Sequence, residues 1–156
     1  MVLYSIMQNS ELSFSFELGV PEHGWLLVNL KAYDLNLSFE SSDVPTDPIQ
    51  QLISSLILLS NGVTNPPTVF WHLEPSYYHF DFQEMNNQIT LSISSANEYG
   101  SSTKSNYQLI GSFTEIIYPI YCELRRFGSA DHKEPHWPNI ERTRYEELNV
   151  AVMKRI

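Results

Sequence analysis

Two histidines and two acids occur among aromatic residues in the stretch FWHLEPSYYHFDF, residues 70–82. His72, Glu74, His79 and Asp81 are residue types that bind zinc, and a carboxylate beside an imidazole can transfer protons. Their HxE…HxD spacing matches no motif with a known mechanism. Alternation of apolar and polar residues explains the same positions without chemistry, because every second residue of a strand faces outward. Two hypotheses follow: a metal-binding or hydrolase-type site, or the exposed face of a hairpin that binds a partner.

The hairpin hypothesis predicts a register and a side for each residue. A turn at Glu74–Tyr77 would place Glu74 opposite Tyr77 and His72 opposite His79, and a second turn at Asn86-Asn87 would place Met85 opposite Gln88. The inward face would carry Val69, Trp71, Leu73, Tyr78, Phe80, Phe82, Leu91 and Ile93. The outward face would carry His72, Glu74, Tyr77, His79, Asp81, Gln83, Thr90 and Ser92. A flat outward face offers no concave site, so this pattern favours binding over catalysis.

Other kinds of chemistry have little support in the sequence. There is no GxSxG, CxxC or HExxH motif and no glycine-rich turn that could hold a phosphate. The single cysteine, Cys122, is expected to be a buried apolar residue. A second polar and aromatic cluster, DHKEPHWP at residues 131–138, is expected to be a loop held in place by Trp137.

The first half of the chain predicts strands and one helix. Alternating residues predict strands over 11–18 and from 25 onward, with a bulge or tight turn at Tyr33–Asp34, where the pattern slips by one residue. Thr46 or Asp47 can cap a helix that begins at Pro48 and ends before Gly62.

The second half, after the hairpin strands, predicts helices. Residues 98–106 are expected to form an exposed loop. Ser112 and Glu115 have capping-box spacing and predict a helix to about Phe127, with Pro119 kinking or dividing it and Gly128 ending it. A final helix is predicted over 141–156, with basic residues in its last turn. We therefore expect one α+β domain over 1–156, a two-layer sandwich with helices on one face of an antiparallel sheet.

Charge is unevenly distributed along the chain. The formal net charge is −9, and residues 1–103 hold 11 acids but a single base, Lys31. Such a field repels nucleic acid and attracts basic partners. No apolar run approaches the about 20 residues needed to cross a bilayer, and MVLYSIMQNS lacks the basic start and cleavage site of a signal peptide. We expect a cytoplasmic protein that binds neither membrane nor nucleic acid.

The order of elements and several phrases resemble a known group of proteins. HGWLLVNLKAYDLNLSFES leads into DPIQQLISSLILL, then into FWHLEPSYYHFDF, and a helical end contains FG…HWP. This layout, from about Trp25 to the C-terminus, resembles the small bacterial immunity proteins encoded beside polymorphic or contact-dependent growth inhibition toxins.

The resemblance implies a toxin inhibitor that is not an enzyme and needs no cofactor. Its partner would be a cognate toxin domain, in many cases a basic nuclease, and acidic residues would attract it while aromatic residues hold it. The alternation, not the resemblance, selects the contact residues: Glu11, Glu17, Glu40, His72, Glu74, Tyr77, His79 and Asp81. Loops at residues 40–47 and 131–138 are alternative contact sites. The competing hypothesis remains a metal-binding or hydrolytic site at His72, Glu74, His79 and Asp81.

Overall fold

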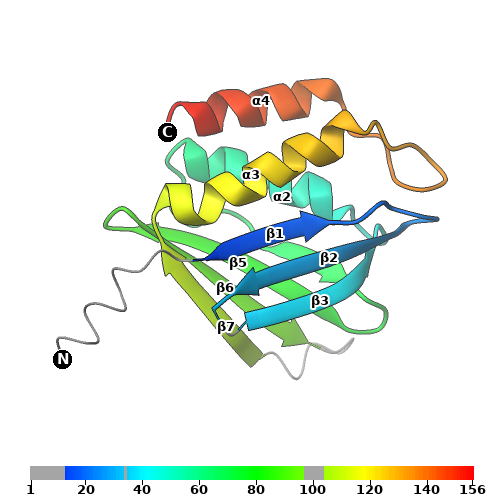
Figure 1. Ribbon diagram of the computed structural model, residues 1–156, viewed down its shortest axis with the longest axis horizontal. Coiled ribbons are helices and arrows are strands. Elements are labelled where there is room, and N and C mark those ends of the chain that lie inside the picture. Colours follow the sequence, from blue (N-terminus) through cyan, green and yellow to red (C-terminus); the bar gives the residue numbers. More distant parts are fainter. Residues whose placement is uncertain (1–12, 34, 97–103) are drawn as a thin grey trace.

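A sheet of seven antiparallel strands carries helices on one of its faces (Figure 1). The computed structural model describes residues 13–33, 35–96 and 104–156. The elements in chain order are β1 (Phe14–Leu18), β2 (Trp25–Ala32), β3 (Leu35–Ser42), α2 (Pro48–Ser60), β4 (Val69–His72), β5 (Tyr77–Met85), β6 (Gln88–Ala96), β7 (Lys104–Gly111), α3 (Phe113–Ser129) and α4 (Arg142–Met153). Each strand pairs with the next one in the chain, so the sheet order is β1 to β7. The predicted α+β class, with an antiparallel sheet and helices on one face, is confirmed.

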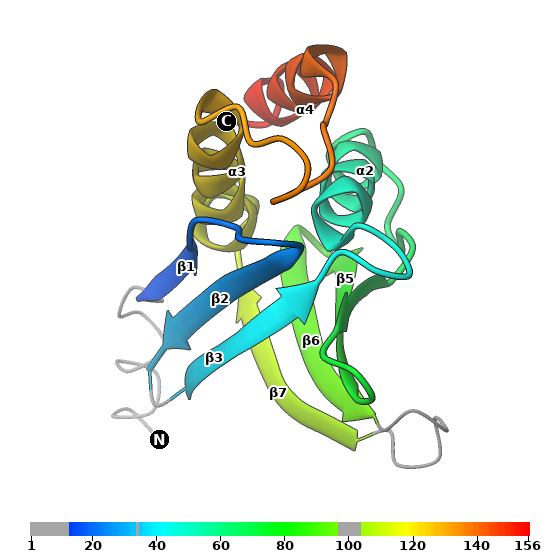
Figure 2. The ribbon, with the colours of Figure 1, turned by 90° about the vertical axis from the view of Figure 1, so that its right-hand side faces the viewer.

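The sheet is strongly curled, not flat (Figure 2). The ring of Phe16 in β1 lies 6.4 Å from that of Trp71 in β4, although a flat sheet would separate these strands by about 14 Å. Phe39 in β3 also contacts Trp71, with 5.7 Å between ring centroids. The inner faces of the two halves of the sheet therefore pack on each other, and α3 contacts both β1 and β7.

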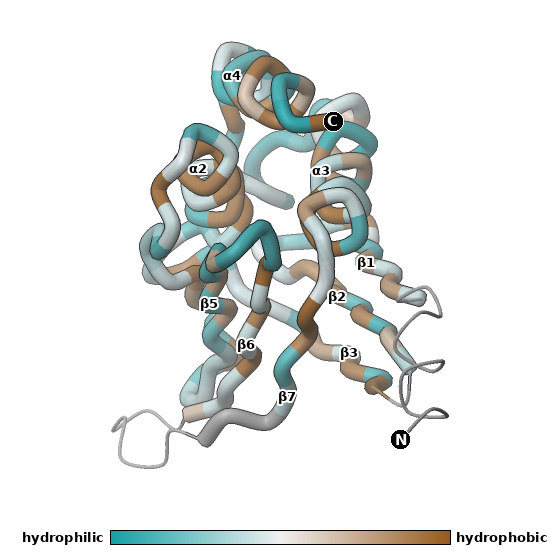
Figure 3. Tube along the Cα trace, turned by 90° about the vertical axis from the view of Figure 1, so that its left-hand side faces the viewer, coloured by the Kyte–Doolittle hydropathy of each residue, from teal (hydrophilic) through white to brown (hydrophobic). Residues whose placement is uncertain are grey.

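Alternation along the strands separates this inner face from an outer face (Figure 3). Leu26, Val28 and Leu30 of β2 point inward and are fully buried, while Leu27 and Lys31, on the alternate positions, are exposed. Helices α2 and α3 cover the inner face, and α4 packs on α2 and α3 from outside (Figures 1 and 2). The helices therefore leave the outer face of the sheet uncovered.

Helix α2 begins and ends where its sequence predicts. The Asp47 carboxylate accepts a hydrogen bond of 2.9 Å from the Ile49 N–H, and Pro48 occupies the first helical position. Gly62 follows the helix with φ +101°, a left-handed conformation that suits glycine.

Helix α3 has the predicted capping box but a different end. Ser112 and Glu115 exchange both capping hydrogen bonds, and the helix continues through Pro119 without division. It also continues through Gly128, so the prediction that this glycine ends the helix is wrong. A Cβ atom at Gly128 would lie 2.7 Å from the ring of Tyr145 in α4. The glycine therefore permits two helices to approach closely.

The side of α3 that faces away from the core carries Cys122. The thiol is exposed, which corrects the expectation of a buried cysteine. The buried residues of α3, such as Tyr121 and Leu124, lie on the opposite side of the helix. Cys122 shares its side of the helix with Tyr118 and Arg125, four residues before it and three after it, and both are exposed.

Of the two predicted hairpin registers, that of β5 with β6 is confirmed and that of β4 with β5 is wrong. In β5 and β6, Met85 pairs with Gln88 as predicted, and Asn86 and Asn87 have the positive φ of a tight turn. In β4 and β5, His72 pairs with Tyr77, not with His79. The turn lies one residue earlier than predicted, because the Leu73 N–H donates a 2.8 Å hydrogen bond to the Ser76 carbonyl and Glu74-Pro75 forms the turn between them. A shift of two residues preserves the side on which each residue lies.

The turn between β2 and β3 is tight, as the slip in the alternation predicts. Ala32 pairs with Leu35, and Tyr33 has φ +51°. Asp34, the other residue of the predicted turn, lies outside the described residues.

Strand β7 and the C-terminal end differ from prediction. Lys104 begins β7, so residues 104–106 belong to a strand and not to the predicted loop, whose other residues lie outside the described part of the chain. The alternation there is weak, because Tyr107 and Ile110 are exposed. Helix α4 has no basic residue in its last turn. Arg155 lies beyond the helix, and its guanidinium is 2.6 Å from the Glu84 carboxylate and 4.4 Å from the Phe113 ring.

None of the helices formed by the described residues has both the length and the apolarity needed to cross a lipid bilayer.

Candidate functional site

Four rings form a cluster on the outer face of β4 and β5. Phe70 and His72 come from β4, and Tyr77 and His79 come from β5. The rings of Tyr77 and His79 stack at 4.9 Å with an angle of 14° between their planes. Phe70 lies 4.8 Å from His79 and 6.2 Å from His72. We call these four residues the outer aromatic cluster.

Strand alternation creates the cluster. Val69, Trp71 and Phe80 point into the core and are fully buried, so their neighbours in sequence must point outward. The Phe70 N–H donates a 2.8 Å hydrogen bond to the side chain of Gln51 in α2. This bond ties β4 to the helical layer and holds the cluster on a rigid support.

The histidines of the cluster lie in a partly dry environment. Burial lowers the pKa of His72, the nearby Glu74 carboxylate opposes this shift, and His79 adds to it. The Nε2 atom of His79 is buried and has no hydrogen-bond partner among the described residues. The cluster therefore presents a largely apolar surface, beneath which the His79 Nε2 atom is buried.

The carboxylates predicted as contacts lie in both halves of the sheet, and two of them belong to the same hairpin as the cluster. Glu74 is exposed in the turn beside His72. Asp81 is half-buried on β5 and accepts a hydrogen bond from the Thr68 hydroxyl. Glu40 is exposed on β3 and Glu17 on β1, in the other half of the curled sheet.

Glu11 lies outside the described residues. The structure thus places His72, Glu74, Tyr77 and His79 together and leaves Glu17 apart.

The geometry offers little to a metal ion. Across residues 13–33, 35–96 and 104–156, no group of three or more His, Cys, Asp or Glu side chains is placed to hold one. His72 lies opposite Tyr77 and His79 lies opposite Phe70, so the predicted cross-strand histidine pair does not form.

Phe70 is the functional candidate that sequence reasoning missed. Its ring contacts His72, Tyr77 and His79, which makes it the centre of the cluster. Its outward position follows from its parity with His72, two residues along the same strand. The sequence signal that could have identified Phe70 is an aromatic residue at an outward-facing position of the strand.

The polar and aromatic loop at residues 131–138 is pinned as predicted. Trp137 is fully buried, and its ring meets Phe127 of α3 edge-on at 6.4 Å. His136 accepts a 3.2 Å hydrogen bond at Nδ1 from the His23 N–H. Burial lowers the pKa of His132, whose ring lies 4.6 Å from Phe127. These contacts attach the loop to the β1–β2 turn and to α3.

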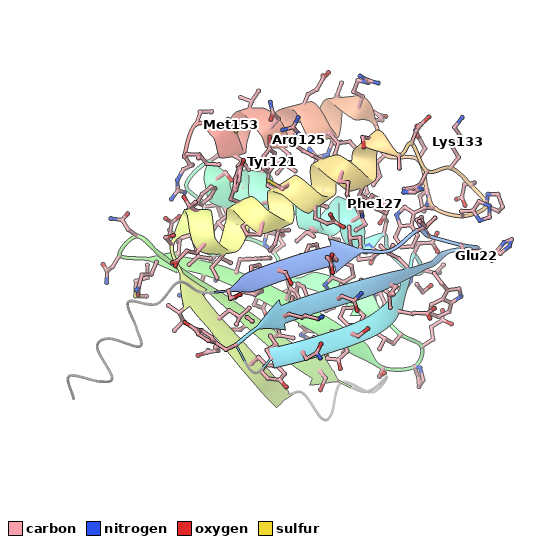
Figure 4. The ribbon with its side chains drawn as sticks, in the orientation of Figure 1. Glu22, Tyr121, Arg125, Phe127, Lys133 and Met153 are labelled. Atoms are coloured by element: carbon pink, nitrogen blue, oxygen red, sulfur yellow. The ribbon has the colours of Figure 1, made fainter. Side chains whose placement is uncertain are left out.

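A cavity of about 820 Å³ lies between α3 and α4, on the far side from the cluster. Arg125, Arg142, Glu141 and Glu146 are among the residues that line it, so its charge is mixed. Figure 4 labels Tyr121 and Arg125 on α3 and Met153 on α4, the two helices that flank this cavity. None of the eight contact residues selected from the alternation lines it, although Asp131 of the alternative contact loop does.

Comparison of the chain with models of protein families, with curated proteins and with solved structures finds no match.

Proposed function

We propose that this protein is a bacterial immunity protein, which binds a cognate toxin domain and neutralises it. The partner would be basic and come from a polymorphic or contact-dependent growth inhibition system. The outer aromatic cluster carries the proposal. It is half-buried, lies on the face that the helices leave uncovered, and is not part of the core. The proposed activity is binding, in the cytoplasm, and not catalysis.

Aromatic clusters of this kind suit a protein interface. Tyrosine and other large aromatic side chains dominate the centres of interfaces because they bury much area with few rotatable bonds. The stacked Tyr77 and His79 rings hold each other in place at 4.9 Å. A preorganised surface loses less conformational entropy when a partner binds.

Charge supports a basic partner. Glu17, Glu40 and Glu74 are exposed, and Lys31 is the single base in residues 1–103. Carboxylates fixed on one face raise the rate at which a basic domain associates, and the effect weakens with salt. A nuclease domain has a basic surface for phosphate, which an acidic surface can cover.

The direct test is titration of the purified protein with the toxin domain encoded by the neighbouring gene. Phe70→Ala and Tyr77→Ala should each weaken binding by about tenfold or more, as expected for central aromatic residues of an interface. Tyr118→Ala is the matched control, because this tyrosine is 37% exposed on α3. It should change the Kd by less than about twofold.

The same variants test neutralisation in cells. Cells that express the toxin domain should grow when the wild-type protein or Tyr118→Ala is present, and should stop growing with Phe70→Ala. Absence of binding by the wild-type protein, or equal effects of Tyr77→Ala and Tyr118→Ala on Kd, would contradict the proposal.

A further inference from the structure

Strand β3 has an edge that the described residues leave largely unpaired. Pairing of Ala32 with Leu35 across a two-residue turn directs the backbone groups of odd-numbered β3 residues toward β2. The N–H and C=O groups of Asn36, Ser38 and Glu40 therefore point away from β2. On that side, β3 pairs with β4 at Ser42 and His72 alone among the described residues. Within the described part of the chain, three residues of β3 thus present an unpaired edge.

The ladder between β3 and β4 ends at Ser42 and His72, where β4 gives way to the turn into β5. Two residues beyond the Ser42–His72 pair, the same register would place Glu40 directly opposite Glu74. Like charges in directly opposed positions destabilise a sheet. The chain instead turns at Leu73, whose N–H bonds to the Ser76 carbonyl. Figure 2 shows the two halves of the sheet splaying apart from the tip of β3.

The surroundings of this edge differ on the two faces of the sheet. On the outer face, Glu40 and Glu74 are both exposed. On the inner face, Leu37 and Tyr78 are half-buried, and Tyr78 stacks on Phe39 at 4.8 Å. A strand placed along the edge would meet carboxylates on one side and apolar groups on the other.

At the other end of the sheet, side chains bond to the backbone of the edge strand β1. At the edge of β1, the Leu18 N–H donates a 2.6 Å hydrogen bond to the Glu123 carboxylate, and the Arg126 guanidinium donates a 2.7 Å bond to the Leu18 carbonyl. Side chains of α3 therefore occupy backbone groups that an approaching strand would use. No such contact from a described residue covers Asn36, Ser38 or Glu40 on their free side.

We propose that the edge of β3 accepts an extended strand of the basic partner. The strand would alternate, with basic residues beside Glu40 and Glu74 and apolar residues toward Leu37 and Tyr78, because side chains of a strand alternate between faces. Backbone hydrogen bonds to Ser38 and Glu40 supply the attachment, and the two carboxylates select positive charge. The identity of this partner as a toxin domain rests on the proposed function, whereas the strand addition does not.

Ser38 allows a matched pair of variants. Its N–H points to the free edge, so Ser38→Pro removes an edge donor without breaking the ladder with β2. The substitution also removes the 2.6 Å hydrogen bond from the Ser38 hydroxyl to Asn29. Ser38→Ala removes the same side-chain bond and keeps the N–H, which isolates the contribution of the edge donor.

The first experiment titrates both variants with the toxin domain. Strand addition predicts that Ser38→Ala binds within about twofold of wild type and that Ser38→Pro binds at least about tenfold more weakly. Thermal melts of both free variants establish that they fold. Equal Kd values for two folded variants would overturn strand addition and leave the proposed function standing.

The second experiment follows amide hydrogen exchange at Ser38 and Glu40. These amides should exchange quickly in the free protein and become protected in the complex. Protection in the protein alone would overturn the proposal, because a second copy or another part of the chain would then cover the edge. Sedimentation measured on the same sample distinguishes these two occupants.

A third experiment does not depend on a toxin. A synthetic peptide of alternating lysine and valine should shift the amide resonances of Asn36, Ser38 and Glu40, and the same peptide N-methylated at alternate residues should not. Peptide binding without toxin binding would support strand addition and contradict the proposed function. If neither the peptide nor the toxin domain affects these amides, strand addition is wrong.

Discussion

Gly128 lies where α3 approaches α4, and its replacement by alanine tests how closely the two helices pack. A Cβ atom at this position would lie 2.7 Å from two ring carbons of Tyr145, whereas non-bonded carbons are most stable about 3.5–4.0 Å apart. Overpacking of this kind costs about 1–3 kcal/mol, and the higher helix propensity of alanine offsets about 1 kcal/mol. We therefore expect Gly128→Ala to lower the free energy of unfolding by about 1 kcal/mol, which lowers the Tm by about 2–4 °C.

Urea denaturation in two backgrounds separates the effect of the contact between residue 128 and Tyr145 from the effect of backbone conformation on the free energy of unfolding. In a Tyr145→Ala protein the ring is absent, so Gly128→Ala should stabilise by up to about 1 kcal/mol. Gly62→Ala is the control: Gly62 has φ +101° and no atom within 4 Å of an added Cβ. Its cost comes from backbone strain and should be the same in both backgrounds. If Gly128→Ala also destabilises both backgrounds equally, the packing argument is refuted.

Three further predictions concern stability. Burial raises the pKa of Asp47 to about 6, above its value in the unfolded chain of about 4. The folded state therefore binds more protons between these values, so the free energy of unfolding should fall by about 3 kcal/mol as pH rises through this window. Asp47→Asn, which keeps a capping oxygen, should remove most of this slope in urea melts at several pH values. Phe80→Ala should destabilise by about 3–5 kcal/mol, because the ring is fully buried. Asp81→Lys should cost about 1 kcal/mol through loss of one hydrogen bond, and swapped outcomes in a denaturant melt would mean that the β5 faces are assigned wrongly. Arg155→Ala should cost about 2 kcal/mol by removing the charged pair with Glu84, whereas Glu84→Gln in the Arg155→Ala background should add little.

Local patterns in the sequence determined most elements of this fold. Alternation defined the two faces of β5 and β6, and Asn86-Asn87 defined their register, because asparagine tolerates the positive φ of a tight turn. The caps of α2 and α3 were predictable because each depends on residues within one helical turn. The outward position of Tyr77 and His79 followed from the same alternation.

Contacts between distant segments decided the rest. Strand β4 is tied to α2 by a bond from Phe70 to Gln51, 19 residues away in the sequence. The role of Gly128 depends on Tyr145, which belongs to another helix. Strand β7 has little alternation of its own and depends on pairing with β6. The curl of the sheet brings Phe16 to Trp71, and among the described residues it leaves β3 paired with β4 at Ser42 and His72 alone. The sequence alone determined which strand residues face outward, and tertiary packing decided which of them meet, because the pairing of β3 with β4 and the curl of the sheet depend on contacts between distant segments.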